Sequence, residues 1–152
     1  MLTTAHLLLG AAIGKAADDP VVAALLAFGS HYILDAIPHY APKPLKRFRK
    51  DGLKDSRKLE LFFKSIEPFL GLVLTAIMVF HFNPDKIVPM ISGSFFGWVP
   101  DLLVFLDWKY KIPRPKAIAE FEDKYHAHVS FLKGLPTFFL VCAGCLVYLI
   151  IK

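Results

Sequence analysis

The sequence predicts an all-α fold, a polytopic membrane bundle of four to five helices, from its apolar content, its block pattern and its length. Of the 152 residues, 55% are hydrophobic, whereas typical soluble domains have about 45–50%. The apolar residues form long blocks, and a membrane helix needs about 20 of them. Four or five such helices use nearly the whole chain, so we expect a single membrane-embedded domain over 1–152.

The first two apolar blocks cover 3–17 and 20–37. At 1.5 Å per residue the first helix is only about 22 Å long. Because the hydrocarbon layer is about 30 Å thick, this helix either crosses a thinned bilayer or lies partly inside the bundle. Pro20 is well placed to begin the second helix, and Pro38 ends or bends it.

Three further blocks cover 59–82, 87–108 and 126–151. Each is long enough to cross a hydrocarbon layer as a helix. The third ends at 83–85, whose asparagine, proline and aspartate indicate a short turn before the fourth. A basic linker separates the fourth block from the fifth.

Positive charge is concentrated in two connecting segments, 41–58 and 109–124. If five helices cross, both segments lie on one side of the membrane, and the positive-inside rule makes that side cytoplasmic. We therefore expect a multi-pass protein of the cell (inner) membrane, embedded in the lipid bilayer, with a cytoplasmic N-terminus. The net charge of +5 does not indicate a nucleic-acid partner, because the sequence has no recognition helix or stacking pattern.

Histidine and acidic residues converge at the cytoplasmic ends of four apolar blocks. Such side chains are costly inside a membrane, so they are candidates for function. His31 and Asp35 are four residues apart and share one helical face. The converging residues are His6, His31, Asp35, His39, Asp101, His126 and His128.

Small residues share helical faces with these polar residues, at a spacing of four. Such faces let membrane helices approach closely, so we expect the polar residues to face the bundle interior. The two series are His6, Gly10 and Gly14 in the first block, and Gly93, Gly97 and Asp101 in the fourth.

Imidazole and carboxylate groups together favour a divalent metal, with zinc the first choice and iron or manganese also suited. Catalytic zinc uses three protein ligands and an open position for water. Asp101 or Glu67 could be the general base that takes a proton from that water. The candidate ligands are His6, His31, Asp35, His39, Asp101 and His128.

Two of these assignments have equally good structural alternatives, and the whole cluster has one. His39 follows Pro38 and could be an interfacial residue instead of a ligand. Glu67 could pair with Lys64, one helical turn back. The cluster as a whole could be a polar network that ties the helices together without metal.

Four segments resemble a family of small prokaryotic inner-membrane proteins described as membrane-bound metal-dependent hydrolases. They are TAHLLLGAAIG, SHYILDAIPH, GWVPDLL and the late histidine cluster before Ser130. The resemblance covers most of the chain and implies a metal-dependent hydrolase. SHYILDAIPH alone is also similar to a helix motif of zinc-dependent phospholipase C, which implies a lipid or phosphoester substrate. The residues on the family's motif positions are His6, His31, Asp35, Asp101 and His128.

The chain departs from the family pattern at two places. Leu103 stands where the family usually has the second aspartate of Pro-Asp-x-Asp. In the late motif, Asp123 takes the first histidine position, and His126 and His128 are only two residues apart. These departures leave open the number of metals and whether the site is catalytic.

The alternative to a hydrolase is a non-catalytic membrane protein, a metal or ion carrier or an assembly factor with a structural His/Asp network. A carrier should place polar groups along a path through the membrane. Here the outer half of each block is nearly free of charge. The sequence therefore favours a site at one face over a transport path.

Overall fold

The protein is described here from a computed structural model, which describes residues 2–40, 55–125, 127–129 and 131–151. Its elements are α1 (Thr3–Ala17), α2 (Pro20–Ala36), β1 (His39–Tyr40), α4 (Asp55–Ile77), a π-helical turn η1 (Met78–Phe82), a 3-10 turn η2 (Pro84–Lys86), α5 (Ile87–Tyr110), α6 (Lys116–Tyr125), β2 (His128–Val129) and α7 (Phe131–Ile150). The all-α class is confirmed, since the two strands have only two residues each.

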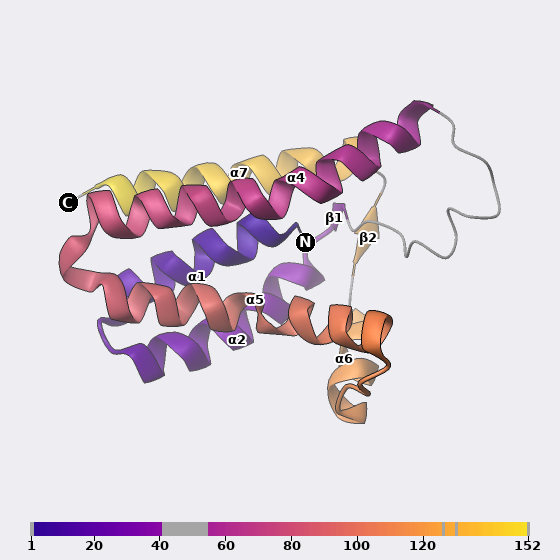
Figure 1. Ribbon diagram of the computed structural model, residues 1–152, viewed down its shortest axis with the longest axis horizontal. Helices are drawn as coiled ribbons and strands as arrows, with labels where there is room; N and C mark the ends of the chain where they lie inside the picture. Colours follow the sequence, from indigo (N-terminus) through magenta and orange to yellow (C-terminus); the bar gives the residue numbers. More distant parts are fainter. Residues whose placement is uncertain (1, 41–54, 126, 130, 152) are drawn as a thin grey trace.

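Helix α1 lies at the centre of the molecule. It packs against α2 and α5 on one side and against α4 and α7 on the other, and α5 also packs against α2 (Figure 1). Its surroundings explain why it is buried nearly all round, with Ala5, Leu8 and Ala11 inaccessible to solvent. The first helix is therefore the core element around which the other helices pack.

The contact between α1 and α5 is made by glycines at the spacing noted in the sequence. A Cβ added to Gly10 would lie 2.3 Å from the carbonyl oxygen of Gly93, and one added to Gly93 would lie 2.1 Å from that of Gly10. One added to Gly14 would lie 2.3 Å from the carbonyl oxygen of Pro89. Only glycine allows the two backbones to touch in this way. The predicted close approach is confirmed, and it brings the polar ends of both helices together.

Two stretches of helix in the described part of the chain are long and apolar enough to cross a membrane, Pro84–Asp107 and Lys133–Ile150. Pro20–Ala36 and Ile66–Phe82 are shorter apolar helices. The helical bundle is thus shown, together with two possible spans.

Polar side chains at the end of the bundle where α1 meets α2 cap helices. The Asp19 carboxylate accepts from the backbone N–H groups of Val21 and Val22, at 2.8 and 2.9 Å, and so caps α2. Lys15 donates through Nζ to the carbonyl oxygens of Tyr148 and Leu149, at 3.0 and 3.2 Å, in the last turn of α7. These groups satisfy backbone atoms that helix ends leave free.

The chain before α7 differs from the expectation that a helix begins at 126. The backbone of Ala127 donates to the carbonyl oxygen of Asp35 and accepts from the N–H of His39, at 3.0 and 3.3 Å. His39 and His128 are partners in a short parallel ladder. These bonds hold the segment extended, so α7 starts later. The basic linker before it contains a ten-residue helix, α6, which the sequence analysis did not predict.

Candidate metal centre

Three imidazole rings from α1, α2 and β1 surround the carboxylate of Asp35. Its Oδ1 lies 3.3 Å from Nε2 of His6 and 3.5 Å from Nε2 of His39. Its Oδ2 lies 3.3 Å from Nε2 of His31. The helical spacing of four places His31 and His39 one turn to either side of Asp35, with His39 just past the helix end.

The cluster is shut off from solvent. The exposed fraction is 2% for His6, 1% for His31, 4% for Asp35 and 0% for His39. A carboxylate at such a place is costly unless a positive charge and hydrogen bonds compensate it. Some cation, either protons or a metal ion, must therefore balance Asp35.

Backbone carbonyls fix the orientation of two of the rings. Nδ1 of His31 lies 2.9 Å from the carbonyl oxygen of Gly97, and Nδ1 of His39 lies 2.7 Å from that of Ile37. Because a carbonyl oxygen only accepts, Nδ1 must be the protonated nitrogen in both rings. In the neutral rings, Nε2 then presents its lone pair to the cluster. Metal-binding histidines are typically held by this kind of bond.

His6 stacks on His31, with ring centroids 3.9 Å apart and an angle of 23° between the planes. Both of its ring nitrogens are buried, and neither makes a hydrogen bond to a residue that the structure describes. Two positively charged rings at this separation would repel each other. At least one of the two imidazoles is therefore neutral and able to donate a lone pair.

Asp101 on α5 completes the group. Ligand atoms of His6, His31 and Asp101 all lie within 4.8 Å of one another, so these three residues could hold a metal ion. Asp101 is the least buried member, whereas the others are fully enclosed. It stands one helical turn after Gly97, whose carbonyl oxygen orients His31.

Nε2 of His6 and Nε2 of His39 approach the same oxygen of Asp35 at about the spacing of ligands of one ion. Metal–nitrogen and metal–oxygen bonds of zinc are about 2.0–2.2 Å, so neighbouring ligands of a tetrahedral ion are about 3.4 Å apart. The three nitrogen–oxygen distances are 3.3, 3.3 and 3.5 Å. A direct bond between a charged donor and a carboxylate is shorter, at about 2.7–2.9 Å.

Glu67 is not brought into this cluster. Its Oε1 accepts from the backbone N–H of Thr4, and its carbonyl oxygen accepts from Oγ1 of Thr4 at 3.0 Å. Thr4 and His6 are two residues apart on α1, which turns their side chains about 200° from each other. Glu67 therefore caps the start of α1 from the side opposite the histidines, and this placement does not support its role as general base.

The late histidines are only partly described. The backbone of His128 lies in β2 beside that of His39, which brings this segment next to the cluster. The side chain of His128 lies outside the described part of the structure, as do all of His126 and the side chain of Lys64. The expected roles of His128 and Lys64 stay predictions.

Two elements of the site had no signal in the side-chain pattern. The carbonyl oxygens of Gly97 and Ile37 orient the rings, but a backbone acceptor leaves no mark in a sequence. The position of Gly97, one turn before Asp101, is the nearest available hint. Comparisons of the chain with protein-family models, with curated proteins and with solved structures find no match.

Proposed function

We propose that this chain is a multi-pass membrane protein that binds one divalent metal ion, zinc by donor chemistry, between α1, α2 and α5, and uses it to hydrolyse an ester or phosphoester at the cytoplasmic face. The observation that carries the proposal is the arrangement of three Nε2 atoms around Asp35, with Nδ1 of two rings bonded to carbonyl oxygens. Imidazole and carboxylate donors of this kind suit zinc, iron and manganese.

The outer surface supports a membrane location. Large apolar side chains are exposed on α2, α4, α5 and α7, among them Leu25, Phe69, Phe96 and Leu140. A soluble protein rarely leaves so many uncovered. In a bilayer they would contact lipid, and shorter helices such as α2 would cross with local thinning or tilt.

The two buried ring nitrogens of His6, which make no hydrogen bond to a described residue, support a divalent ion over protons alone. Asp35 and Asp101 carry two negative charges, and a divalent ion among neutral imidazoles would cancel them. Protons would have to sit on Nε2 of His31 and His39, making both imidazolium, because their Nδ1 atoms are already protonated. Those two imidazolium rings would balance the two carboxylates, but they would leave both nitrogens of His6 without a hydrogen bond to any described residue. A metal ion would give all three rings a role as ligands.

Hydrolysis needs a water molecule and a proton acceptor. A bound divalent ion would supply a water that is nucleophilic at neutral pH and would polarise the ester. We assign the role of proton acceptor to Asp101, the least buried acid of the cluster, whose ligand atom lies within 4.8 Å of those of His6 and His31. The water oxygen bonds to the carbonyl carbon or phosphorus, the bond to the leaving oxygen breaks, and the alcohol leaves with the proton.

A second candidate is a non-catalytic protein in which the same cluster is structural. The nearly complete burial of His31, Asp35 and His39 favours it, since structural metal sites are closed. The two candidates differ in turnover and not in metal content. A carrier is less favoured, because the described polar groups at the other end of the bundle cap helices.

The test is the metal content of the detergent-purified protein, measured by plasma mass spectrometry for the wild type, Asp35→Asn and Asp85→Asn. Asp85 is exposed in η2, so its variant is a matched control. We expect about one equivalent of metal in the wild type and the control, and a large loss in Asp35→Asn with circular dichroism unchanged. Equal metal content in all three, or none in a folded wild type, would overturn the proposal. Turnover of ester and phosphodiester substrates by the metal-loaded protein then separates the hydrolase from the structural candidate.

A further inference from the structure

A groove lies between α2 and α6, on the outer side of the helix that carries His31 and Asp35. Its volume is about 470 Å³, and it is a shallow hollow open to the surface, which would not enclose a bound molecule as most small-molecule sites do. The lining is apolar except for the phenol oxygen of one residue. The lining residues are Gly29, Tyr32, Ile33, Ala36 and Phe121.

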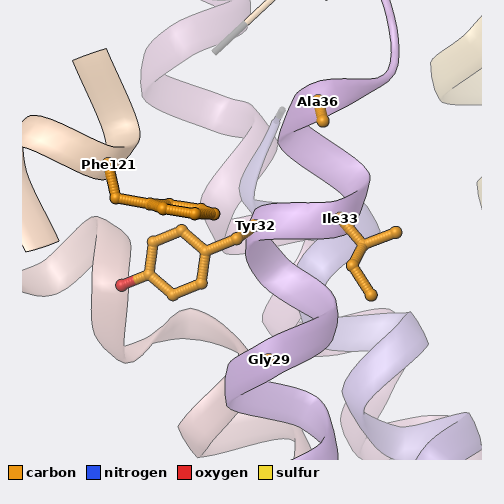
Figure 2. Close-up of a pocket in the computed structure, with 5 residues that line it drawn as sticks. All are labelled: Gly29, Tyr32, Ile33, Ala36 and Phe121. Atoms are coloured by element: carbon orange, nitrogen blue, oxygen red, sulfur yellow. The ribbon is translucent and has the colours of Figure 1, made fainter. Parts of the chain in front are cut away.

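Two aromatic rings line one side of the groove, and the space beside Gly29 is unoccupied. Figure 2 shows the rings of Tyr32 and Phe121 together, with Ile33 and Ala36 along α2 and the phenol oxygen directed away from them. The two rings meet edge to face, with centroids 5.7 Å apart. A Cβ added to Gly29 would touch nothing within 4 Å, so the space above this residue is open.

The groove continues onto the apolar surface of α2. Ile33 is 71% exposed, and Leu26 and Ile37 on the same helix are also exposed. In the proposed membrane location these side chains contact lipid. An occupant of the groove would therefore enter from the hydrocarbon layer and be apolar.

Basic residues lie beside the groove, on α6 and the segment before it. Residues 109–125 contain five lysines and arginines against three acids. Lys124 stands three residues after Phe121, on a neighbouring part of the same helical face. Arg114 pairs with Asp107 at 3.2 Å, and Lys116 pairs with Glu120 at 3.7 Å. With Asp107 counted, residues 107–125 hold five basic and four acidic side chains, a surplus of one positive charge. Positively charged segments at a membrane attract anionic headgroups.

Tyr32 connects the groove to the metal centre. Its ring meets that of His31 edge to face, with centroids 5.4 Å apart, and on its other side it meets Phe121. One side chain thus separates the groove from a candidate ligand. A lipid in the groove would therefore have to extend its polar end past the ring of Tyr32 to reach the cluster.

We propose that this groove binds an acyl chain of an anionic phospholipid, so that the substrate class of the candidate hydrolase is a membrane lipid. The substrate assignment rests on the proposed function, whereas lipid binding in the groove does not. The apolar lining, the opening toward lipid, the neighbouring positive charge and the contact through Tyr32 all fit this one occupant.

The test uses the full chain in nanodiscs that contain phosphatidylglycerol with a diazirine in one acyl chain. After illumination, mass spectrometry maps the labelled peptides. We expect labelling of 29–36 and of the peptide around Phe121 that saturates as the probe fraction rises, because a site fills while bulk lipid contact grows linearly. In Gly29→Trp the indole fills the groove, and saturable labelling should fall by about tenfold. Gly144→Trp on α7 is the control, because a Cβ there also meets nothing within 4 Å.

Lipid binding in the groove would be refuted by linear labelling spread over all exposed helices. It would also be refuted by saturable labelling that Gly29→Trp leaves unchanged. A phosphatidylcholine probe should label the groove less than the phosphatidylglycerol probe does. Equal labelling by the two probes would refute the preference for an anionic headgroup. Metal content is measured on the same samples and should be unchanged in Gly29→Trp. Saturable labelling in a protein that binds no metal would leave the groove intact and refute the proposed function, so the two failures are distinguishable.

Discussion

Nδ1 of His31 donates a hydrogen bond to the carbonyl oxygen of Gly97 at 2.9 Å, which ties a ring on α2 to the backbone of α5. The same stretch of α5 touches α1, since a Cβ on Gly97 would lie 3.0 Å from the carbonyl oxygen of His6. Gly97 therefore orients the ring of His31 and lies against the backbone of His6. Close helix packing and ring geometry depend on the same residue.

Replacing Gly97 with alanine should weaken metal binding while the fold persists. The added methyl group pushes α5 from α1 by a few tenths of an ångström, and the bond that orients His31 lengthens. Loss of such a supporting bond typically lowers metal affinity about 10–100-fold. Competition with a fluorescent chelator measures this affinity. Gly144→Ala, at an open position on α7, should bind metal like the wild type, and equal affinity in both variants would contradict the account.

Replacing Gly93 with alanine should destabilise the whole bundle. Its Cβ would lie 2.1 Å from the carbonyl oxygen of Gly10, a backbone atom that cannot move alone. Overpacking of this kind typically costs about 1–3 kcal/mol. The midpoint of thermal unfolding in detergent should fall well below that of Gly144→Ala. An unchanged midpoint would show that α1 and α5 do not approach this closely.

Replacing Glu67 with glutamine should affect stability and leave the metal in place. The carboxylate lies at the N-terminus of α1 and accepts from Thr4, where a negative charge typically contributes about 0.3–1 kcal/mol or somewhat more when buried. We expect a modest fall in the unfolding midpoint. Metal content, measured on the same preparation, should match the wild type. Loss of metal would place Glu67 in the site after all.

Replacing Asp101 with asparagine should reduce hydrolysis and spare metal binding. Asparagine keeps the shape of the side chain but cannot accept the proton of the attacking water. Loss of a general base typically lowers the rate about 10²–10⁴-fold. Rates are compared at full metal loading, with Asp107→Asn as the control because Asp107 pairs with Arg114 outside the cluster. If Asp101→Asn binds no metal, Asp101 is a ligand and the proton-acceptor role is wrong.

The helices and half of the site could be predicted because their signals are local. Apolar blocks and Pro20 mark α1 and α2 within one residue of their ends. The series through Gly10 and Gly93 predicts the closest backbone contact correctly. That contact sets the depth of α1 against α5 and brings Gly97, one turn before Asp101, to the backbone of His6.

Features that depend on long-range backbone bonds could not be predicted. The pairing of His39 with His128 joins residues far apart in the sequence through main-chain groups, which are the same for every residue type. For the same reason the contact of Glu67 with the backbone of Thr4 could not be predicted. Helix α6 was missed because its short amphipathic pattern lies in a charged linker.

Zinc K-edge X-ray absorption on the purified, zinc-loaded protein shows whether a metal ion sits among the histidines around Asp35. We predict a first shell of nitrogen and oxygen at about 2.0–2.2 Å with the multiple-scattering signature of imidazole. The signature should be lost in a His31→Gln, Asp35→Asn double variant and kept in His81→Gln, whose ring is exposed in η1. Sulfur at about 2.3 Å, which Cys142 and Cys145 on α7 could supply, or a shell of water oxygen alone, would contradict the account.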